Sequence, residues 1–274
     1  MRTGAKQIFE RNRAVGRIAL TVTCNSGMTR RACLREEGPL RVRCPGAPGE
    51  HLEAMIINTA GGVAGGDRLQ IAVRVETDAR LTMTTAAAEK IYRSLGSNAM
   101  LANKFEIAER GSLEWLPQET ILFDGARLSR SIEIGIARDA RLVFAEATVF
   151  GRSGMGEEVH HGLFFDRWTL RCDGRLLHME ATRLDGPIAA KLRQTAVGKG
   201  AVAFATVLVV PGDERTALAV RALADQFHAE VGVSAWNGFA IARLCAKNGA
   251  ALRHDLITLV GAIRGTSLPR LWLN

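Results

Sequence analysis

The chain has 274 residues, 47% of them hydrophobic, enough to bury a large core in one domain or two. Lys and Arg number 36 against 28 Asp and Glu, and the net charge of +8 favours acidic partners without defining a fold. Aromatic residues make up only 5%, with one tyrosine, which argues against a stacking surface for single-stranded nucleic acid.

The first two hundred residues are dominated by strand-like alternation. In residues 69–75 (LQIAVRV) every second side chain is apolar, as a half-buried strand requires. Residues 131–136 (SIEIGI) repeat the pattern with three isoleucines. The sequence therefore predicts a largely β protein.

A weak internal repeat runs through this part, in residues 77–81, 108–113, 138–142 and 172–176. Each copy is a strand, a tight polar turn with Asp or Gly, and a returning strand. Such turns suit antiparallel hairpins, because Asp and Gly tolerate positive φ. Successive copies lie roughly thirty residues apart, a spacing typical of stacked strand units.

The C-terminal third changes character. Residues 213–231 predict a helix with Asp213 as its N-cap, and residues 250–263 predict a second one. Between them, residues 233–245 predict two strands around a turn at Asn237 and Gly238. Because no linker or low-complexity segment occurs, we expect one domain over residues 1–274. The predicted fold class is mainly β: stacked antiparallel hairpins forming a β-helix or sandwich-like scaffold, with about two helices in the C-terminal third.

The compartment is predicted from the cysteines and the chain start. The cysteines form no C-x-x-C pair, so neither a zinc knuckle nor a disulfide framework is suggested, and buried free thiols of a reducing compartment are expected. They are Cys24, Cys33, Cys44, Cys172 and Cys245. The basic residues 1–17 lead into no apolar h-region, and the longest apolar run, residues 201–210, is too short to span a bilayer. We expect a soluble cytoplasmic protein.

A glycine-rich segment, residues 58–68 (NTAGGVAGGDR), invites comparison with nucleotide loops. A phosphate-binding P-loop needs Lys-Ser or Lys-Thr after its last glycine, and a dinucleotide loop needs a following helix. Here a strand follows instead, so the segment is predicted to be a structural turn. Asp67 either caps this turn through the backbone or faces a partner or a metal path; both readings stay open.

Two further groups carry metal-ligand chemistry. Residues 151–161 contain Met155, Glu157, His160 and His161, a mixture suited to nickel, copper or zinc. Neighbouring residues on a strand point to opposite faces, so the two histidines would not converge on one ion, and a glycine-hinged surface loop is favoured.

Farther on, His178 and Glu180 share one face of a strand. They are interpreted as two metal ligands, a proton relay or a hydrogen-bonded pair. The pair is favoured, since the sequence supplies no third partner.

Enzyme signatures are thin: G-x-S-x-G, H-E-x-x-H and a local Cys/His signature are all missing from the sequence. The main alternative is a metal-dependent hydrolase using Glu157, His160, His161 and Glu180. Another is a nucleic-acid-binding protein drawing on the +8 charge, although its arginines are dispersed without interleaved aromatics.

Four segments together resemble the UreD (UreH) family of urease accessory proteins. Residues 58–67 are similar to its N-x-x-G-G-x-x-x-G-D motif. Residues 84–94 (TTAAAEKIYRS) resemble its T-T-Q-A-A-x-K-[IV]-Y segment, with Ala86 where glutamine is usual. Residues 116–126 match L-P-[QD]-[EP]-x-I-x-F-x-x-[AS], and residues 151–157 match G-R-x-x-[MS]-G-E.

The resemblance implies a non-enzymatic urease maturation factor on a largely β, helix-poor scaffold. It implies a complex in which this chain binds UreF and UreF in turn binds the GTPase UreG. This complex is expected to dock on apo-urease and help to load nickel. The nickel is expected to be transient, with no tightly bound cofactor, and neither nucleic acid nor a membrane is an expected partner. Asp67, Glu157 and Glu180 are the carboxylates that we expect along the nickel path, because oxygen ligands hold a borderline ion weakly.

Overall fold

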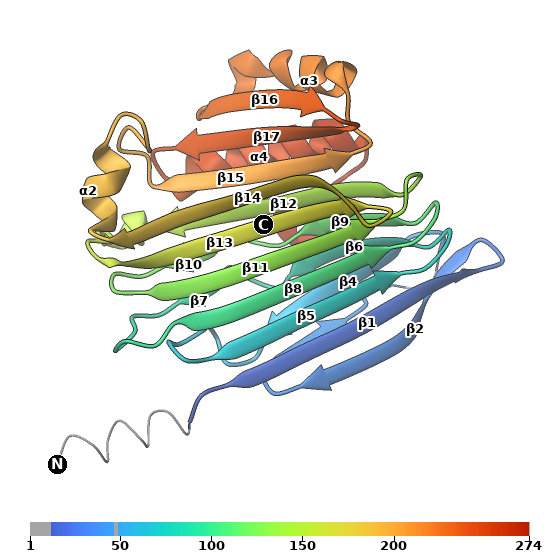
Figure 1. Cartoon of the computed structure of the whole chain (residues 1–274), viewed down its shortest axis with the longest axis horizontal. Coiled ribbons are helices and arrows are strands. Elements are labelled where there is room, and N and C mark those ends of the chain that lie inside the picture. The colour runs from blue at the N-terminus through green and yellow to red at the C-terminus, as the bar shows by residue number, and fades with distance from the viewer. Residues whose placement is uncertain (1–11, 47–48, 274) are drawn as a thin grey trace.

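The computed structural model describes residues 12–46 and 49–273, so most of the basic N-terminal segment lies outside the described residues. Its strands form two sheets (Figure 1). Sheet A consists of β1 (Val15–Asn25), β2 (Met28–Glu37), β5 (Arg68–Val75), β8 (Ala99–Ile107), β11 (Arg127–Ile136), β13 (Gly162–Cys172) and β14 (Arg175–Gly186). Sheet B consists of β3 (Leu40–Arg43), β4 (Leu52–Asn58), β6 (Arg80–Thr85), β9 (Ser112–Leu116), β12 (Arg141–Phe150), β15 (Ala203–Val210), β16 (Glu230–Trp236) and β17 (Phe239–Ala246). The short strands β7 (Glu89–Ile91) and β10 (Thr120–Leu122) branch from it.

The central strands form stacked coils, and most of their pairings are parallel. Strands β5, β8, β11 and β13 pair in parallel within sheet A, and β4, β6, β9 and β12 do so within sheet B. Each coil passes from sheet B through a short side to sheet A and back. The mainly β, solenoid-like scaffold is therefore confirmed.

One detail of the predicted pairing is wrong. The turns after β5, β8 and β11 carry the chain from sheet A to sheet B, so the flanking strands are not hairpin partners. Only the fourth copy, at Asp173 and Gly174, joins an antiparallel pair, β13 and β14. A tight polar turn serves either connection, and it is burial of the apolar strand faces between two sheets that selects the crossing.

The internal repeat marks equivalent positions of successive coils. Leu52, Leu81, Leu113 and Leu142 are neighbours in one ladder, and all four side chains are buried. At the turns, the Arg110 guanidinium donates hydrogen bonds of 2.7 and 3.0 Å to the Asp78 carboxylate of the preceding coil. The thirty-residue spacing is thus the length of one coil.

The core between the sheets is apolar and aromatic. The Phe105 ring from sheet A meets the Phe144 ring from sheet B edge to face, with centroids 5.2 Å apart. Trp115 and Trp168 extend this cluster. Aromatic pairs of this geometry hold the two sheets in a fixed relation.

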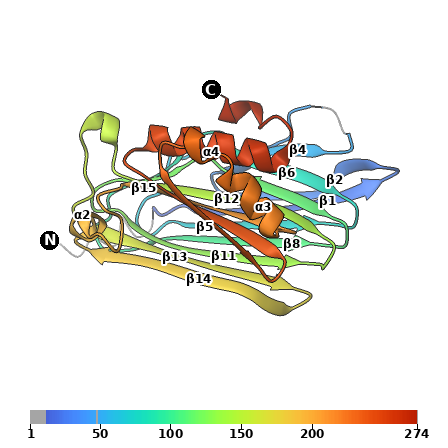
Figure 2. The ribbon, with the colours of Figure 1, turned by 90° about the horizontal axis from the view of Figure 1, so that it is seen from above.

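The helices cover the outer face of sheet B (Figure 2). They are α3 (Glu214–Arg221) and α4 (Gly249–Arg264), while the short α2 (Ile188–Arg193) precedes β15. Asp213 caps α3 as predicted, its carboxylate accepting from the Thr216 amide at 3.0 Å. The helix predicted over residues 213–231 is wrong beyond Arg221. There the short 3-10 helix η2 (Ala224–Gln226) leads into β16, whose pairing with β17 outweighs helix propensity.

The compartment is predicted from buried free thiols and from the lack of a segment that could span a bilayer, and the structure bears on both features. All five cysteines are free, but none is buried: Cys33 is exposed and the other four are half-buried, which corrects the expectation of buried thiols. Within residues 12–46 and 49–273, no helix combines the length and apolar composition needed to cross a bilayer.

Candidate metal-handling site

The glycine-rich segment forms the short side of the first coil. Val63 bridges in parallel to Ile91 of β7, Ile91 pairs with Leu122 of β10, and Leu122 pairs with Phe150. A Cβ on Gly62 would lie 2.4 Å from the Tyr92 ring, and one on Gly65 would lie 2.1 Å from Ser94 Oγ. Glycine is needed here for close approach between coils, and the predicted structural turn is confirmed.

Asp67 is buried at the end of this segment, and both carboxylate oxygens accept backbone hydrogen bonds. Oδ2 accepts from the Ala64 amide and Oδ1 from the Ala14 amide, each at 2.8 Å. The turn-capping role is therefore observed, and the carboxylate also fixes the chain just before β1. A part for Asp67 in a metal path stays a prediction.

Glu89 lies opposite the glycine-rich segment and is the carboxyl with the most altered acidity there. The Asn58 side-chain amide donates to both of its oxygens at 3.1 Å. Burial raises the pKa of Glu89 to about 7, although the hydrogen bond from Asn58 opposes the shift. A carboxyl of this kind exchanges its proton near neutral pH.

The loop after β12 places Glu157 in an ion pair. Arg152 Nε donates to Glu157 Oε2 at 2.6 Å, and this hydrogen bond is the main cause that lowers the pKa of Glu157. The Arg152 guanidinium also lies 4.2 Å from the centroid of the Phe123 ring. His160 lies 3.8 Å from Glu158 at the surface, while the His161 amide donates to Asp124 at 3.1 Å.

His178 and Glu180 are in contact on β14, as the period of two predicts. His178 Nε2 lies 3.3 Å from Glu180 Oε2, and the Arg243 guanidinium from β17 pairs with the same oxygen. The favoured reading, a hydrogen-bonded pair, is confirmed. Arg243 is the third partner that the sequence did not reveal.

Glu180 also lines a cavity of about 470 Å³ between the two sheets. Deeper in its wall lies a buried cluster, in which Arg130 on β11 bonds Asp166 on β13 through two N–H groups at 2.9 and 2.5 Å. The same guanidinium pairs with Glu146 on β12. The indole N–H of Trp115 donates to Glu146 at 2.8 Å, and that of Trp168 donates to Asp166 at 3.0 Å.

The charged wall of this cavity has an excess of acid. Glu146, Asp166 and Glu180 stand against Arg130 and Arg243, which is three carboxyl groups to two guanidinium groups. Burial raises the pKa of Glu146, opposed by the Arg130 charge. Side-chain exposure falls from 55% at Arg243 through 18% at Glu180 to 5% at Glu146, so acidic groups continue from the surface inward.

The three carboxylates predicted for a metal path do not form one compact site. Asp67 and Glu157 lie near the end of the coils at which the parallel strands of sheet A begin. Glu180 pairs with Trp168, six residues into β13 from Gly162, which is about 20 Å along the strand. The ligand set of the alternative hydrolase is likewise divided between the loop and mid-strand β14.

Arg130, Glu146 and Asp166 were missed by sequence reasoning, although a signal existed. In β11, Arg130 occupies the same face as the buried Leu128 and Ile132. In β12, Glu146 interrupts an otherwise apolar run. A charge at a position that the pattern assigns to the core indicates a buried ion pair or a functional site.

The four segments quoted for the family resemblance belong to one corner of the molecule. Residues 58–68, 84–94 and 116–126 contain the short sides of successive coils, and residues 151–157 follow Phe150 of the next coil. The fold and this site define a class of protein: a two-sheet β scaffold of stacked coils with a cavity between the sheets that carries three carboxyl groups.

Comparison with known proteins identifies the family within that class. The family model described as UreD urease accessory protein matches residues 14–273. A urease accessory protein UreD of Rhodopseudomonas palustris (strain ATCC BAA-98 / CGA009) is 53% identical over 268 residues, covering 98% of this chain and 96% of that protein. One from Bradyrhizobium diazoefficiens is 49% identical over 267 residues, covering 97% and 96%. This chain belongs to the UreD family of urease accessory proteins.

Proposed function

We propose that this chain is a non-catalytic urease maturation factor of the cytoplasm. It bridges apo-urease and the UreF–UreG complex, contacting UreG through UreF, and passes nickel toward the urease active site. Family membership supports the role in urease maturation. The observation that carries nickel transfer is the cavity between the sheets, whose wall holds three carboxyl groups against two guanidinium groups, with Glu180 at its more exposed part.

The chemistry of the cavity suits cargo better than a resident cofactor. A conduit must bind an ion well enough to admit it and weakly enough to release it. Carboxylate oxygens hold nickel less tightly than imidazole or thiolate groups do, and the excess of one carboxyl group attracts a cation.

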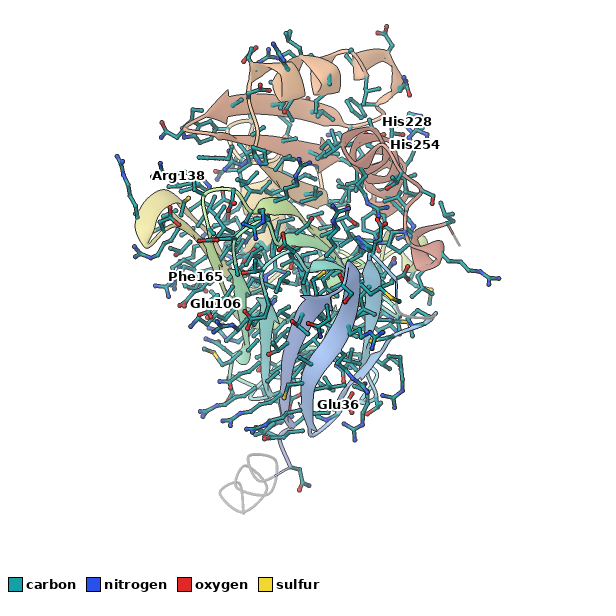
Figure 3. All side chains as sticks on the ribbon, turned by 90° about the vertical axis from the view of Figure 1, so that its right-hand side faces the viewer. Glu36, Glu106, Arg138, Phe165, His228 and His254 are labelled. Carbon is teal, nitrogen blue, oxygen red and sulfur yellow. The ribbon has the colours of Figure 1, made fainter. Side chains whose placement is uncertain are left out.

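Glu180→Gln tests the nickel path because the amide keeps the side-chain shape and removes one negative charge. The variant chain is combined with UreF, UreG, apo-urease and nickel, and nickel per urease active site is measured beside recovery of the complex. We expect nickel loading to fall several-fold while the complex is recovered in full. Glu106→Gln, a change at an exposed carboxylate of sheet A (Figure 3), is the matched control and should load normally.

Asp67→Asn and Glu157→Gln extend the test to the other end of the coils. Thermal unfolding must accompany Asp67→Asn, since its carboxylate also holds the first strand. Normal loading in all three variants would argue against the nickel path but not against bridging. Bridging itself fails if UreF–UreG binds and activates apo-urease equally well without this chain.

A further inference from the structure

A second set of metal-ligating side chains lies apart from the cavity. His228, His254 and Asp255 offer ligand atoms that all lie within 4.8 Å of one another, the one group of three such residues in the described ranges 12–46 and 49–273. His254 and Asp255 belong to α4, and His228 lies between η2 and β16. Figure 3 shows both histidines together beside this helix, at the surface.

Asp255 is held rigidly beneath the two rings. It is fully buried, and its oxygens accept from the His228 amide at 3.0 Å and the Ala229 amide at 2.6 Å. His254 Nδ1 lies 3.0 Å from Asp255 Oδ1. In the neutral tautomer that donates from Nδ1 to this carboxylate, Nε2 keeps its lone pair for a metal ion. This carboxylate–histidine arrangement is the one that orients metal-binding imidazoles in proteins.

The second imidazole lies directly against the first. The ring centroids of His228 and His254 are 4.2 Å apart and the ring planes differ by 11°. Both side chains are exposed, so they can tilt without disturbing the core. Two nitrogens on one ion at about 2.1 Å each lie roughly 3.4 Å apart in tetrahedral geometry. Because the lone pair of each nitrogen lies in its ring plane, the exposed rings must turn out of their parallel stack to bind one ion.

We propose that His228 and His254 bind one divalent ion of borderline softness, such as Ni²⁺, Cu²⁺ or Zn²⁺. His254 coordinates through Nε2, His228 supplies a second ring nitrogen, and water completes the shell. Asp255 is a positioning residue, since its oxygens are already engaged. Imidazole nitrogens select these ions over Mg²⁺ and Ca²⁺. This site is independent of the proposed nickel path, and two protein ligands make it weaker than a four-ligand structural site.

Calorimetric titration of the full chain with ZnCl₂ or NiCl₂ tests the site, with Cu²⁺ electron paramagnetic resonance as a second readout. We expect one ion per chain to be lost in the double variant His228→Ala/His254→Ala, and each single change to weaken binding at least tenfold. The Cu²⁺ spectrum should report two nitrogen ligands in the wild type. His160→Ala/His161→Ala and Glu180→Gln are matched controls that should retain this ion.

Asp255→Asn separates positioning from ligation. It should weaken binding about 10- to 100-fold while the Cu²⁺ spectrum still reports two nitrogens. If that buried change unfolds the chain, the exposed histidine variants still decide. Unchanged stoichiometry in the double histidine variant, or loss of the ion in the His160/His161 control, overturns the proposal. Because urease takes no part in the measurement, its outcome is separate from that of the nickel-path test.

Discussion

At the scale of single residues, acidic side chains of similar appearance in the sequence have different environments. Asp67 is held by two backbone amides, Glu157 is neutralised by Arg152, and Glu89 is partly buried beside Asn58 with a pKa of about 7. Asp67 and Glu157 stand out in the sequence through their motifs. The burial and hydrogen bonds of these carboxyl groups depend on how segments distant in the sequence pack together, which the sequence alone does not reveal.

Glu89→Gln should alter the pH dependence of stability. A carboxyl whose pKa is about 7 when folded and near 4.5 when unfolded contributes stability that is complete below pH 4.5. That contribution is lost as pH rises through 7, by about 1.4 kcal/mol per pH unit at most. Urea unfolding at pH 5 and pH 8 should show a smaller loss of stability in the variant than in the wild type.

The matched control for this measurement is Glu109→Gln, at an exposed turn carboxylate with 70% side-chain exposure. It should follow the wild-type pH profile. Identical profiles for the wild type and Glu89→Gln would show that Glu89 titrates as an ordinary exposed carboxyl.

At the scale of elements, strand existence was predictable and strand partnership was not. Period-two alternation correctly indicated β5 and β11, and Asn237 with Gly238 correctly marked the turn between β16 and β17. Local turn chemistry predicts hairpins at residues 77–81 and 108–113, because it does not reveal whether the next strand stays in its sheet. Similarly, the α3 prediction ran too far because β16 forms only against β17.

Gly65→Ala tests the close packing between neighbouring short sides. Gly65 has an ordinary backbone conformation, but an added Cβ would lie 2.6 Å from the Ser97 carbonyl oxygen as well as against Ser94. We expect a loss of about 1–3 kcal/mol in the free energy of unfolding, as for other overpacked sites. Gly232→Ala, where no atom lies within 4 Å of the new Cβ, should cost much less in the same urea titration; equal costs would contradict close packing as the cause.

At the scale of the whole molecule, the scaffold class and the late helices were predictable from pattern and motif, while the interior was not. The cavity arises where β11, β13 and β14 face β12, β15 and β17, so its charged wall combines residues spread from Arg130 to Arg243 along the sequence. His228 and His254 likewise lie together only because the segment between η2 and β16 packs against α4, where the His228 amide donates to Asp255. The single-domain assignment stays a prediction.

Arg130→Met tests how the two sheets are joined, since Arg130 links β11 and β13 of sheet A to β12 of sheet B. Removing it leaves Glu146 and Asp166 buried without their cation, which should cost about 3–5 kcal/mol. Chemical denaturation measures the loss. Arg138→Met, at a surface arginine with 89% side-chain exposure (Figure 3), should be close to neutral. A small effect of Arg130→Met would mean that the sheets are held by apolar packing alone.

The leucine ladder Leu52–Leu81–Leu113–Leu142 shows that the coils stack in register at a regular spacing. Each coil adds one strand to each of the two sheets and lengthens the stack by about 4.8 Å. The separation between the β1–β2 edge and the opposite β16–β17 edge is therefore set by the number of stacked strands rather than by any linker. Proteins bound at those two ends would be held at a distance fixed by the number of repeats in this chain.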